Sequence, residues 1–199
     1  LWTGVAAGAE GAMFHLLTHT LMKGLAFLAV GAFLYALYLQ NDHHGPSTSL
    51  VTSAQSSGSG HGPLVVSDLA GAAQKYPLAA LSLAIALLAL GGMPPLAGFM
   101  SKWQIFVAGF VAGNPWTIGL AIFMAFNSVL SLGYYAPVVN MLYRKEQSVL
   151  VQHGAKIPLA MLLPLMVLML AVIAIGLWPG LATWLSEPAG LWLAQVFGH

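Results

Sequence analysis

Three basic side chains recur every four residues inside a segment that is otherwise apolar. His15, His19 and Lys23 stand in GAMFHLLTHTLMKGLAFLAVGAFLYALYL, a run from Gly11 to Leu39 with no other charged residue. Each step of four residues turns a helix by only about 40° beyond a full turn, so the three side chains share one face. The spacing therefore predicts a basic stripe along a single helix.

A second lysine stands in a similarly apolar setting. Lys102 follows the run GGMPP by a few residues and is the only charged group between Pro77 and Asn114. Charged groups at membrane depth are costly, and they usually line a polar path or face a partner. Two such lysines, one beside two histidines, favour a protein that moves protons or small cations.

These residue types can exchange protons near neutral pH. Desolvation disfavours the charged form of a lysine, and histidine titrates close to neutrality without help. Water bridging the steps of about 6 Å along the row would make His15, His19 and Lys23 a relay, with Lys102 as a further station. The structural alternative is that Lys23 reaches the membrane surface or pairs with another helix, while the histidines are satisfied core residues. We favour the relay for the aligned trio.

Composition sets the class of protein. The chain is 59% apolar and 6% charged, whereas soluble domains carry roughly 25% charged residues. A net charge of +1 gives no support for nucleic-acid binding. With no cysteine in the sequence, we exclude disulfides and thiolate-bound iron–sulfur or zinc sites in this chain. Because it starts at Leu1 without a signal-like segment, we expect it to begin partway through a longer protein.

Apolar runs long enough to cross a bilayer predict an all-α, polytopic membrane protein with a single membrane domain over residues 1–199. The second run is interrupted by consecutive prolines, which cannot continue a helix. Two separate spans would each be only about 16 residues, or roughly 24 Å, so we predict one broken helix instead. The four expected spans are about 11–39, 77–113 (broken at 93–97), 115–143 and 158–177.

Two further segments differ in composition from the spans. Residues 41–66 are rich in Ser, Gly and Pro, which predicts a flexible aqueous loop. Its histidines, His43, His44 and His61, lack metal-ligand spacing, so we interpret them as solvated. Residues 178–199 form an amphipathic, tryptophan-containing tail. We expect the tail to finish the last span and then to lie along the membrane interface.

The basic residues outside the spans set the orientation. Arg144, Lys145 and Lys156 gather in one connecting segment, which the positive-inside rule places on the cytoplasmic side. Counting spans backwards puts the segment that contains Lys75 on that side too. A split second span would separate these segments, so the orientation supports one broken helix.

These segments resemble a known family. MFHLLTHTLMKGLAFLAVG is similar to the His-x3-His-x3-Lys helix of the antiporter-like subunits of respiratory complex I and of Mrp-type Na⁺/H⁺ antiporters. The segments DLAGAAQKYPLAALSLAIALLALGGMPPLAGFMSKWQIF and SLGYYAPVVNMLYR resemble the subunit N type of NADH-quinone oxidoreductase, including its F(420)H(2)-dehydrogenase relatives. The likeness extends from about Gly11 to Pro179.

The resemblance implies a place in a larger fold. Members of the family have fourteen transmembrane helices in two inverted repeats, and this chain would be the C-terminal part, including the second broken helix. The lysine of that helix lies on a hydrated axis in the family and is linked to proton exit, and Lys102 occupies its position. Lys23 and His19 match the connecting residues of the axis, and His15 lies one turn earlier.

The function implied is proton translocation by a membrane subunit of a complex I-type NAD(P)H- or F(420)H(2):quinone oxidoreductase. Such a subunit is part of a translocase but holds no redox site or metal of its own. Quinone, flavin and iron–sulfur clusters are expected in partner subunits of the membrane arm and beyond. We expect an energy-transducing membrane, in a bacterium or archaeon rather than an organelle. Alternatives are an Mrp-type antiporter or membrane-bound hydrogenase subunit, and a purely structural membrane-arm scaffold.

Overall fold

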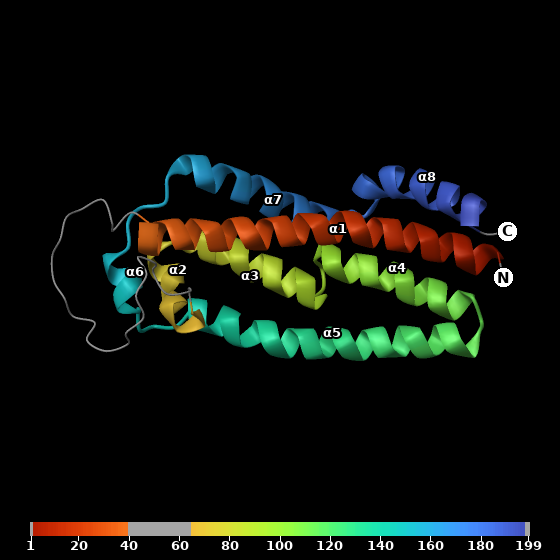
Figure 1. Cartoon of the computed structure of the whole chain (residues 1–199), viewed down its shortest axis with the longest axis horizontal. Helices are drawn as coiled ribbons and strands as arrows, with labels where there is room; N and C mark the ends of the chain where they lie inside the picture. Colours follow the sequence, from red (N-terminus) through yellow and green to blue (C-terminus); the bar gives the residue numbers. More distant parts are fainter. Residues whose placement is uncertain (1, 40–64, 198–199) are drawn as a thin grey trace, which may run out of the picture.

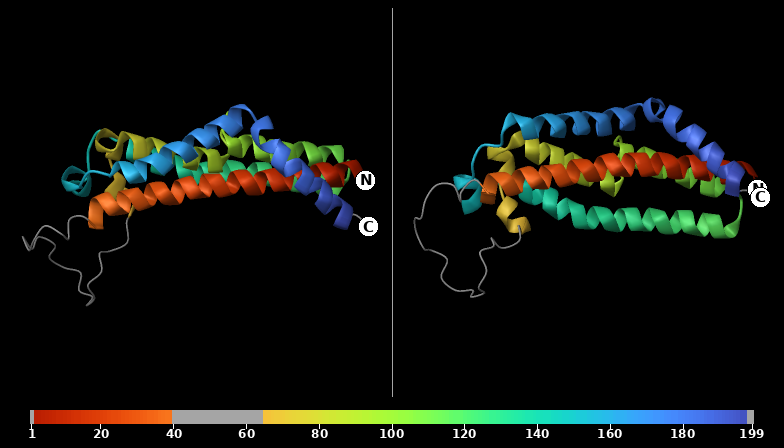
Figure 2. Two further views of the ribbon diagram at one scale, coloured as in Figure 1. Left: turned by 90° about the horizontal axis from the view of Figure 1, so that it is seen from above. Right: turned by 45° about the horizontal axis from the view of Figure 1, so that its top comes forward.

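The computed structural model describes residues 2–39 and 65–197, and all the regular structure within them is helical. Helix α1 (Trp2–Leu34) continues as one π-helical turn, η1 (Tyr35–Leu39), and runs the length of an elongated bundle (Figures 1 and 2). The helix thus begins nine residues before the predicted span. Most of the predicted loop 41–66, with its three histidines, lies outside the described residues.

The predicted break in the second span is present. After η3 (Val66–Leu69) and the short α2 (Ala72–Lys75), helix α3 covers Pro77–Gly91 and α4 covers Ala97–Val111. The two helices follow one another in the same direction along α1 (Figure 1). The pair therefore makes one passage of the bundle. Proline at the first position of α3 supplies a fixed φ where no amide partner is needed.

The chain returns along the broken pair in α5 (Pro115–Leu142), whose first turn is capped by the Asn114 side chain accepting from the amide of Trp116. A short helix, α6 (Val149–His153), turns the chain at the same end as α2. Helix α7 (Leu159–Leu177) then runs back along α1. The predicted third and fourth spans match α5 and α7 to within one residue at each end.

The tail is helical. It forms α8 (Gly180–Phe197), which continues from α7 toward the end of the bundle where the chain termini lie, packed obliquely on α1 (Figures 1 and 2). Close packing explains this course. A Cβ atom at Gly190 would lie 2.6 Å from the Cα atom of Glu10, so the missing side chain lets the backbone of α8 rest on α1.

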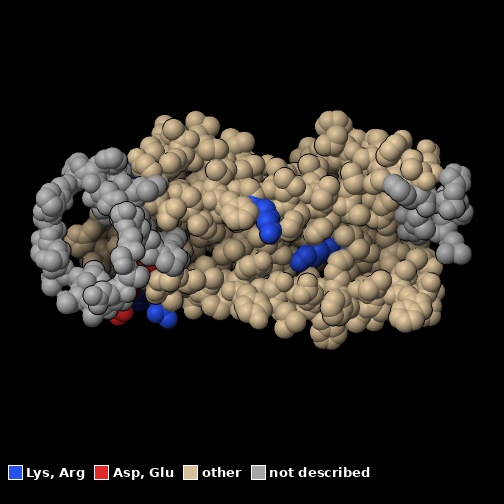
Figure 3. Space-filling model, in the orientation of Figure 1, with Lys and Arg blue, Asp and Glu red and all other residues tan. Residues whose placement is uncertain are grey.

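The described part of the chain is an integral membrane protein by length and composition. Three of its helical segments are long and apolar enough to cross a bilayer, namely Ala6–Leu37, Pro115–Leu142 and Leu159–Leu177, and the shorter α3 is also apolar. Large apolar side chains face outward, as in α5, where Phe123 is 70% exposed. On the face drawn in Figure 3, two basic patches interrupt an otherwise uncharged middle, and other charged groups lie at the end with α2 and α6. The all-α membrane fold is confirmed.

Candidate functional site at the helix break

The three residues of the basic stripe on α1, His15, His19 and Lys23, become more exposed along the helix. His15 is half-buried, His19 is partly exposed and Lys23 is exposed on the described part of the chain. The two imidazole rings follow one another along the helix, with centroids 5.5 Å apart and planes tilted by 33°. The predicted common face is present, but its inner end is histidine and its outer end is lysine.

A serine of α4 joins the stripe to the broken helix. The Nδ1 atom of His15 lies 2.9 Å from the Oγ atom of Ser101, which is fully buried. The Ser101 hydroxyl donates to the carbonyl of Gly98 at 3.2 Å, so in this arrangement Nδ1–H of His15 donates to Ser101. Rotation of the hydroxyl would reverse the direction of the bond in the tautomer whose Nδ1 carries no hydrogen. The pair can therefore carry a proton in either sense.

Lys102, the next residue, reaches the end of α3. Its Nζ atom donates to the carbonyl of Leu90 at 3.0 Å. Helix ends leave carbonyls without intrahelical partners, and here the amides of Gly92 and Met93 bond those of Ala89 and Leu88. The ammonium group supplies the partner for the next carbonyl. A positive charge is also favourable at a helix C-terminus.

Glycine makes this geometry attainable at the break. Gly92 has a φ of +83°, and a Cβ there would lie 3.2 Å from both the Cδ and the Nζ atoms of Lys102. Gly98 lies against the carbonyl of Ala89 and the sulfur of Met22, with no room for a side chain. The first residue gives the chain its turn and the lysine its space. The second brings α3, α4 and α1 together.

Charge links the groups into one set. His15 and His19 follow one another on α1, Lys23 stands one turn further along the same face, and Lys102 follows the serine that contacts His15. A proton on one group thus raises the electrostatic energy of a proton on the next. Imidazole and amine side chains of this kind are able to take up and release protons. Its groups come from two helices that are separated in the sequence by the whole of α3.

The predicted site residues are therefore only partly gathered. The structure brings His15, His19 and Lys102 around the start of α4, whereas Lys23 points to the exposed end of the stripe. Ser101 was missed from the sequence, although a serine directly before the lysine of an apolar half-helix was a usable signal. Thr18, between the two histidines of α1, is buried and donates to carbonyls of its own helix at Phe14 and His15.

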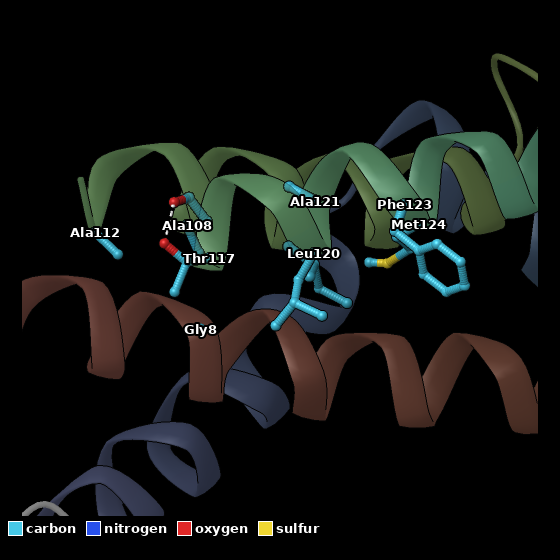
Figure 4. A pocket seen from close by; sticks show the side chains of 10 residues that line it. Gly8, Ala108, Ala112, Thr117, Leu120, Ala121, Phe123 and Met124 are labelled. Carbon is cyan, nitrogen blue, oxygen red and sulfur yellow. Dashed lines mark hydrogen bonds between the residues drawn. The ribbon is translucent and has the colours of Figure 1, made fainter. Parts of the chain in front are cut away.

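Two cavities lie along α1 and α4. An apolar one of about 430 Å³ lies between α1, α4 and α5 (Figure 4), where the hydroxyl of Thr117 donates to the carbonyl of Gly109. It offers little chemistry. A more polar cavity of about 310 Å³ between α1, α4 and α8 is lined by Glu10, Gln104 and Glu187. It lies on the two helices that carry His15 and Lys102, toward the chain termini.

The chain is similar to known membrane subunits. A family model described as NADH:quinone oxidoreductase/Mrp antiporter, TM, matches residues 1–127. The chain is 32% identical over 169 residues to F(420)H(2) dehydrogenase subunit N of Methanosarcina mazei, covering 85% of this chain and 30% of that protein. It is 36% identical over 143 residues to NAD(P)H-quinone oxidoreductase subunit 2 of Thermosynechococcus vestitus, covering 72% of this chain and 22% of that protein.

Solved structures share the fold. A chain of the Mrp complex from Dietzia sp. superposes with a TM-score of 0.71 at 21% identity, covering 99% of this chain and 39% of that chain. A chain of respiratory complex I from Thermus thermophilus gives a TM-score of 0.62 at 24% identity, covering 93% and 36%. The present chain spans less than a third of the two sequence relatives above and less than two fifths of these structures.

Proposed function

This chain belongs to the NADH:quinone oxidoreductase/Mrp antiporter family of membrane subunits, and from that premise we propose that it is the C-terminal part of a proton-translocating subunit of a complex I-type quinone oxidoreductase. Protons would pass through the axis formed by Lys23, His19, His15 and Lys102. The sequence relatives named for quinone and F(420)H(2) oxidoreductases support this choice within the family.

One observation carries the proposal. The 2.9 Å contact between His15 and Ser101 connects the α1 stripe to the residue beside Lys102. In the proposed step the imidazolium form of His15 releases its Nδ1 proton to the Ser101 oxygen and becomes neutral imidazole, while the hydroxyl proton of Ser101 leaves through a bridging water to a neutral Lys102, which becomes an ammonium ion. Each transfer breaks one bond to hydrogen as it forms another, so Ser101 ends the step unchanged.

Charge coupling would give the axis its direction. Protonation of His15 and His19 disfavours the ammonium form of Lys102, which then expels its proton. The cavity lined by Glu10, Gln104 and Glu187 lies on the same two helices and supports an exit toward the chain termini. Electron transfer elsewhere in the assembly would drive this cycle by changing the charge state of Lys23.

The proposed subunit depends on partners for its redox chemistry. Its enzymatic role is to form part of a translocase, with quinone, flavin and iron–sulfur clusters held by other subunits. Its partners are the preceding helices of the same subunit, the neighbouring membrane-arm subunits and lipid. We place it in the plasma membrane of a bacterium or archaeon, with the end that carries Lys75, Arg144 and Lys156 in the cytoplasm.

Replacement of Lys102 tests this function in the intact assembly. Lys102→Met should abolish proton translocation driven by quinone reduction while the subunit still inserts and assembles. Lys145→Met, which removes an exposed lysine from a connecting segment, is the matched control and should pump normally. Unchanged pumping by Lys102→Met would favour the structural scaffold.

An Mrp-type antiporter remains the second candidate, supported by the family model and by the Mrp complex as a structural neighbour. It predicts sodium-dependent proton exchange in vesicles that hold the assembly but receive no reductant. The oxidoreductase role predicts no such exchange without electron flow. A membrane-bound hydrogenase subunit would instead show pumping coupled to hydrogen evolution.

A further inference from the structure

A basic cavity lies far from the helix break, where α3 and α7 begin. Its volume is about 370 Å³, and its walls come from residues 75–79 and from Lys156, Ile157 and Leu162. Lys75 and Lys156 supply its charge, and no acidic residue lines it. The cavity therefore combines two positive charges with an apolar floor.

Its position in the fold matches the boundary of the bilayer. Helix α3 begins at Pro77 and α7 at Leu159, and each is apolar from its first turns onward. Both lysines precede these starts by two or three residues. Lys75 and Lys156 therefore stand at headgroup depth, while Leu78 and Leu162 lie on the hydrocarbon side.

The structure holds one lysine in place and leaves it a free donor. The Nζ atom of Lys75 donates to the carbonyls of Gln152 at 2.8 Å and Gly154 at 2.6 Å, at the end of α6. An ammonium group has three N–H donors, so one remains for a ligand. Within the part of the chain that the structure describes, the ammonium of Lys156 makes no hydrogen bond and is exposed. Both lysines can therefore contact an anion in this cavity.

We propose that this cavity binds an anionic phospholipid. The headgroup phosphate would lie between Lys75 and Lys156, and an acyl chain would follow Leu78, Ile157 and Leu162 into the bilayer. A free phosphate ion would gain from the lysines but not from the apolar floor, so the lining favours a lipid. Anionic lipids are drawn to basic segments at the cytoplasmic surface, which is where the positive-inside rule puts this end.

Photocrosslinking of the intact assembly tests this site. The assembly is reconstituted in phosphatidylcholine vesicles with a small share of phosphatidylglycerol that carries a photoreactive acyl chain, and crosslinked peptides are mapped by mass spectrometry. We expect adducts at the starts of α3 and α7. Lys156→Gln should lower their yield about fivefold, the factor expected for one lysine near the surface. Lys156→Arg should restore it, and Lys145→Gln should leave it unchanged.

A second pair of variants, one in the cavity and one control, tests the apolar part of the cavity lining. Leu162→Trp fills the cavity and should lower the yield, whereas Leu163→Trp alters the exposed neighbouring position, outside the cavity lining, and should not. An equal effect of Lys156→Gln and Lys145→Gln would overturn the site. Loss of adducts on adding inorganic phosphate, with no effect of Leu162→Trp, would show a phosphate site instead. Absence of adducts in the assembled complex would mean that a protein neighbour covers the cavity, which also contradicts the proposal.

Discussion

The imidazole of His15 and the hydroxyl of Ser101 are 86 positions apart in the sequence and 2.9 Å apart in the structure. The contact joins α1 to the first turns of α4, directly beside the lysine that caps α3. The hydroxyl has a second partner in the carbonyl of Gly98. Ser101 is therefore hydrogen-bonded on two sides, to the imidazole of α1 and to the backbone of its own helix, one residue before Lys102.

Removing this hydroxyl should impair proton transport without unfolding the bundle. Ser101→Ala leaves Nδ1 of His15 without its partner in α4, which costs about 1 kcal/mol and slows the transfer at least about fivefold. Ser101→Thr keeps a hydroxyl and should retain more of the activity. The measurement is the rate of proton uptake into vesicles that hold the assembly, at equal rates of electron delivery.

Ser82→Ala is the matched control for that variant. Ser82 is also fully buried, and its hydroxyl contacts the sulfur of Met169 at 3.6 Å, on the α7 side of α3. The two substitutions remove the same group from equally buried positions. If both lower the rate alike, the loss reflects packing, and Ser101 has no place in the relay.

The sequence was informative where local rules decide structure. Consecutive prolines located the break, because they cannot extend a helix, and the four-residue spacing put His15 and His19 on one face. It could not show that Ser101 meets His15, because this contact depends on how closely α1 and α4 approach. The sequence also could not show that the Lys23 side chain is exposed on the described part of the chain while His15 is half-buried. A face of a helix is defined by its spacing, but whether that face is covered depends on helices distant in the sequence.

The positive φ of Gly92 allows a test of the hydrogen bond from Lys102 to the carbonyl of Leu90 at the end of α3. Gly92→Ala forces a side chain into the left-handed region, at about 1–2 kcal/mol. Its Cβ would also lie 3.2 Å from the Nζ atom of Lys102, so the ammonium must move from the carbonyl of Leu90. We expect proton transport to fall severalfold beyond what the loss of stability explains.

Gly113→Ala separates those two effects. Gly113 also has a positive φ, +65°, but the nearest atom to its Cβ would be 4.0 Å away. Gly113→Ala should therefore lose a similar free energy of folding, because alanine is strained at a positive φ, but it displaces no neighbouring group. It should lower thermal stability as Gly92→Ala does while transporting protons at the normal rate. Equal transport by both variants would show that the position of Lys102 at the break is unimportant.

Packing at Gly98 should control whether the broken helix assembles at all. Gly98→Ala would press a methyl group against the carbonyl of Ala89 and the sulfur of Met22. Since backbone lies in the way, we expect a loss of about 3 kcal/mol or more, read as a lower unfolding temperature of the subunit in detergent. Gly133→Ala, in the middle of α5 with nothing near its Cβ, should be neutral or slightly stabilising. Similar losses in both would mean that helix propensity, not close approach, determines the effect.

Tyr76, directly before α3, predicts a pH dependence at the opposite end of the molecule. Its hydroxyl donates to the carbonyl of Ala155 at 2.8 Å, and burial raises the pKa of this group above its ordinary value of 10.0. The folded state therefore holds the proton to higher pH than the unfolded chain does. The stability from this bond is complete below pH 10.0 and falls as pH rises from there toward the raised pKa.

Tyr76→Phe should therefore cost about 1 kcal/mol of unfolding free energy near neutral pH. The difference from the native chain should shrink on raising the pH above 10.0, since phenylalanine does not titrate there. Tyr143→Phe, at a side chain that is 51% exposed, is the control and should show neither effect. Unfolding measured by near-ultraviolet circular dichroism across this range decides the matter. If the difference in unfolding free energy between Tyr76→Phe and the native chain stays constant with pH, the pKa of Tyr76 is not raised by folding. The bond from Tyr76 to the carbonyl of Ala155 then does not stabilise the packing of α3 on the segment after α6.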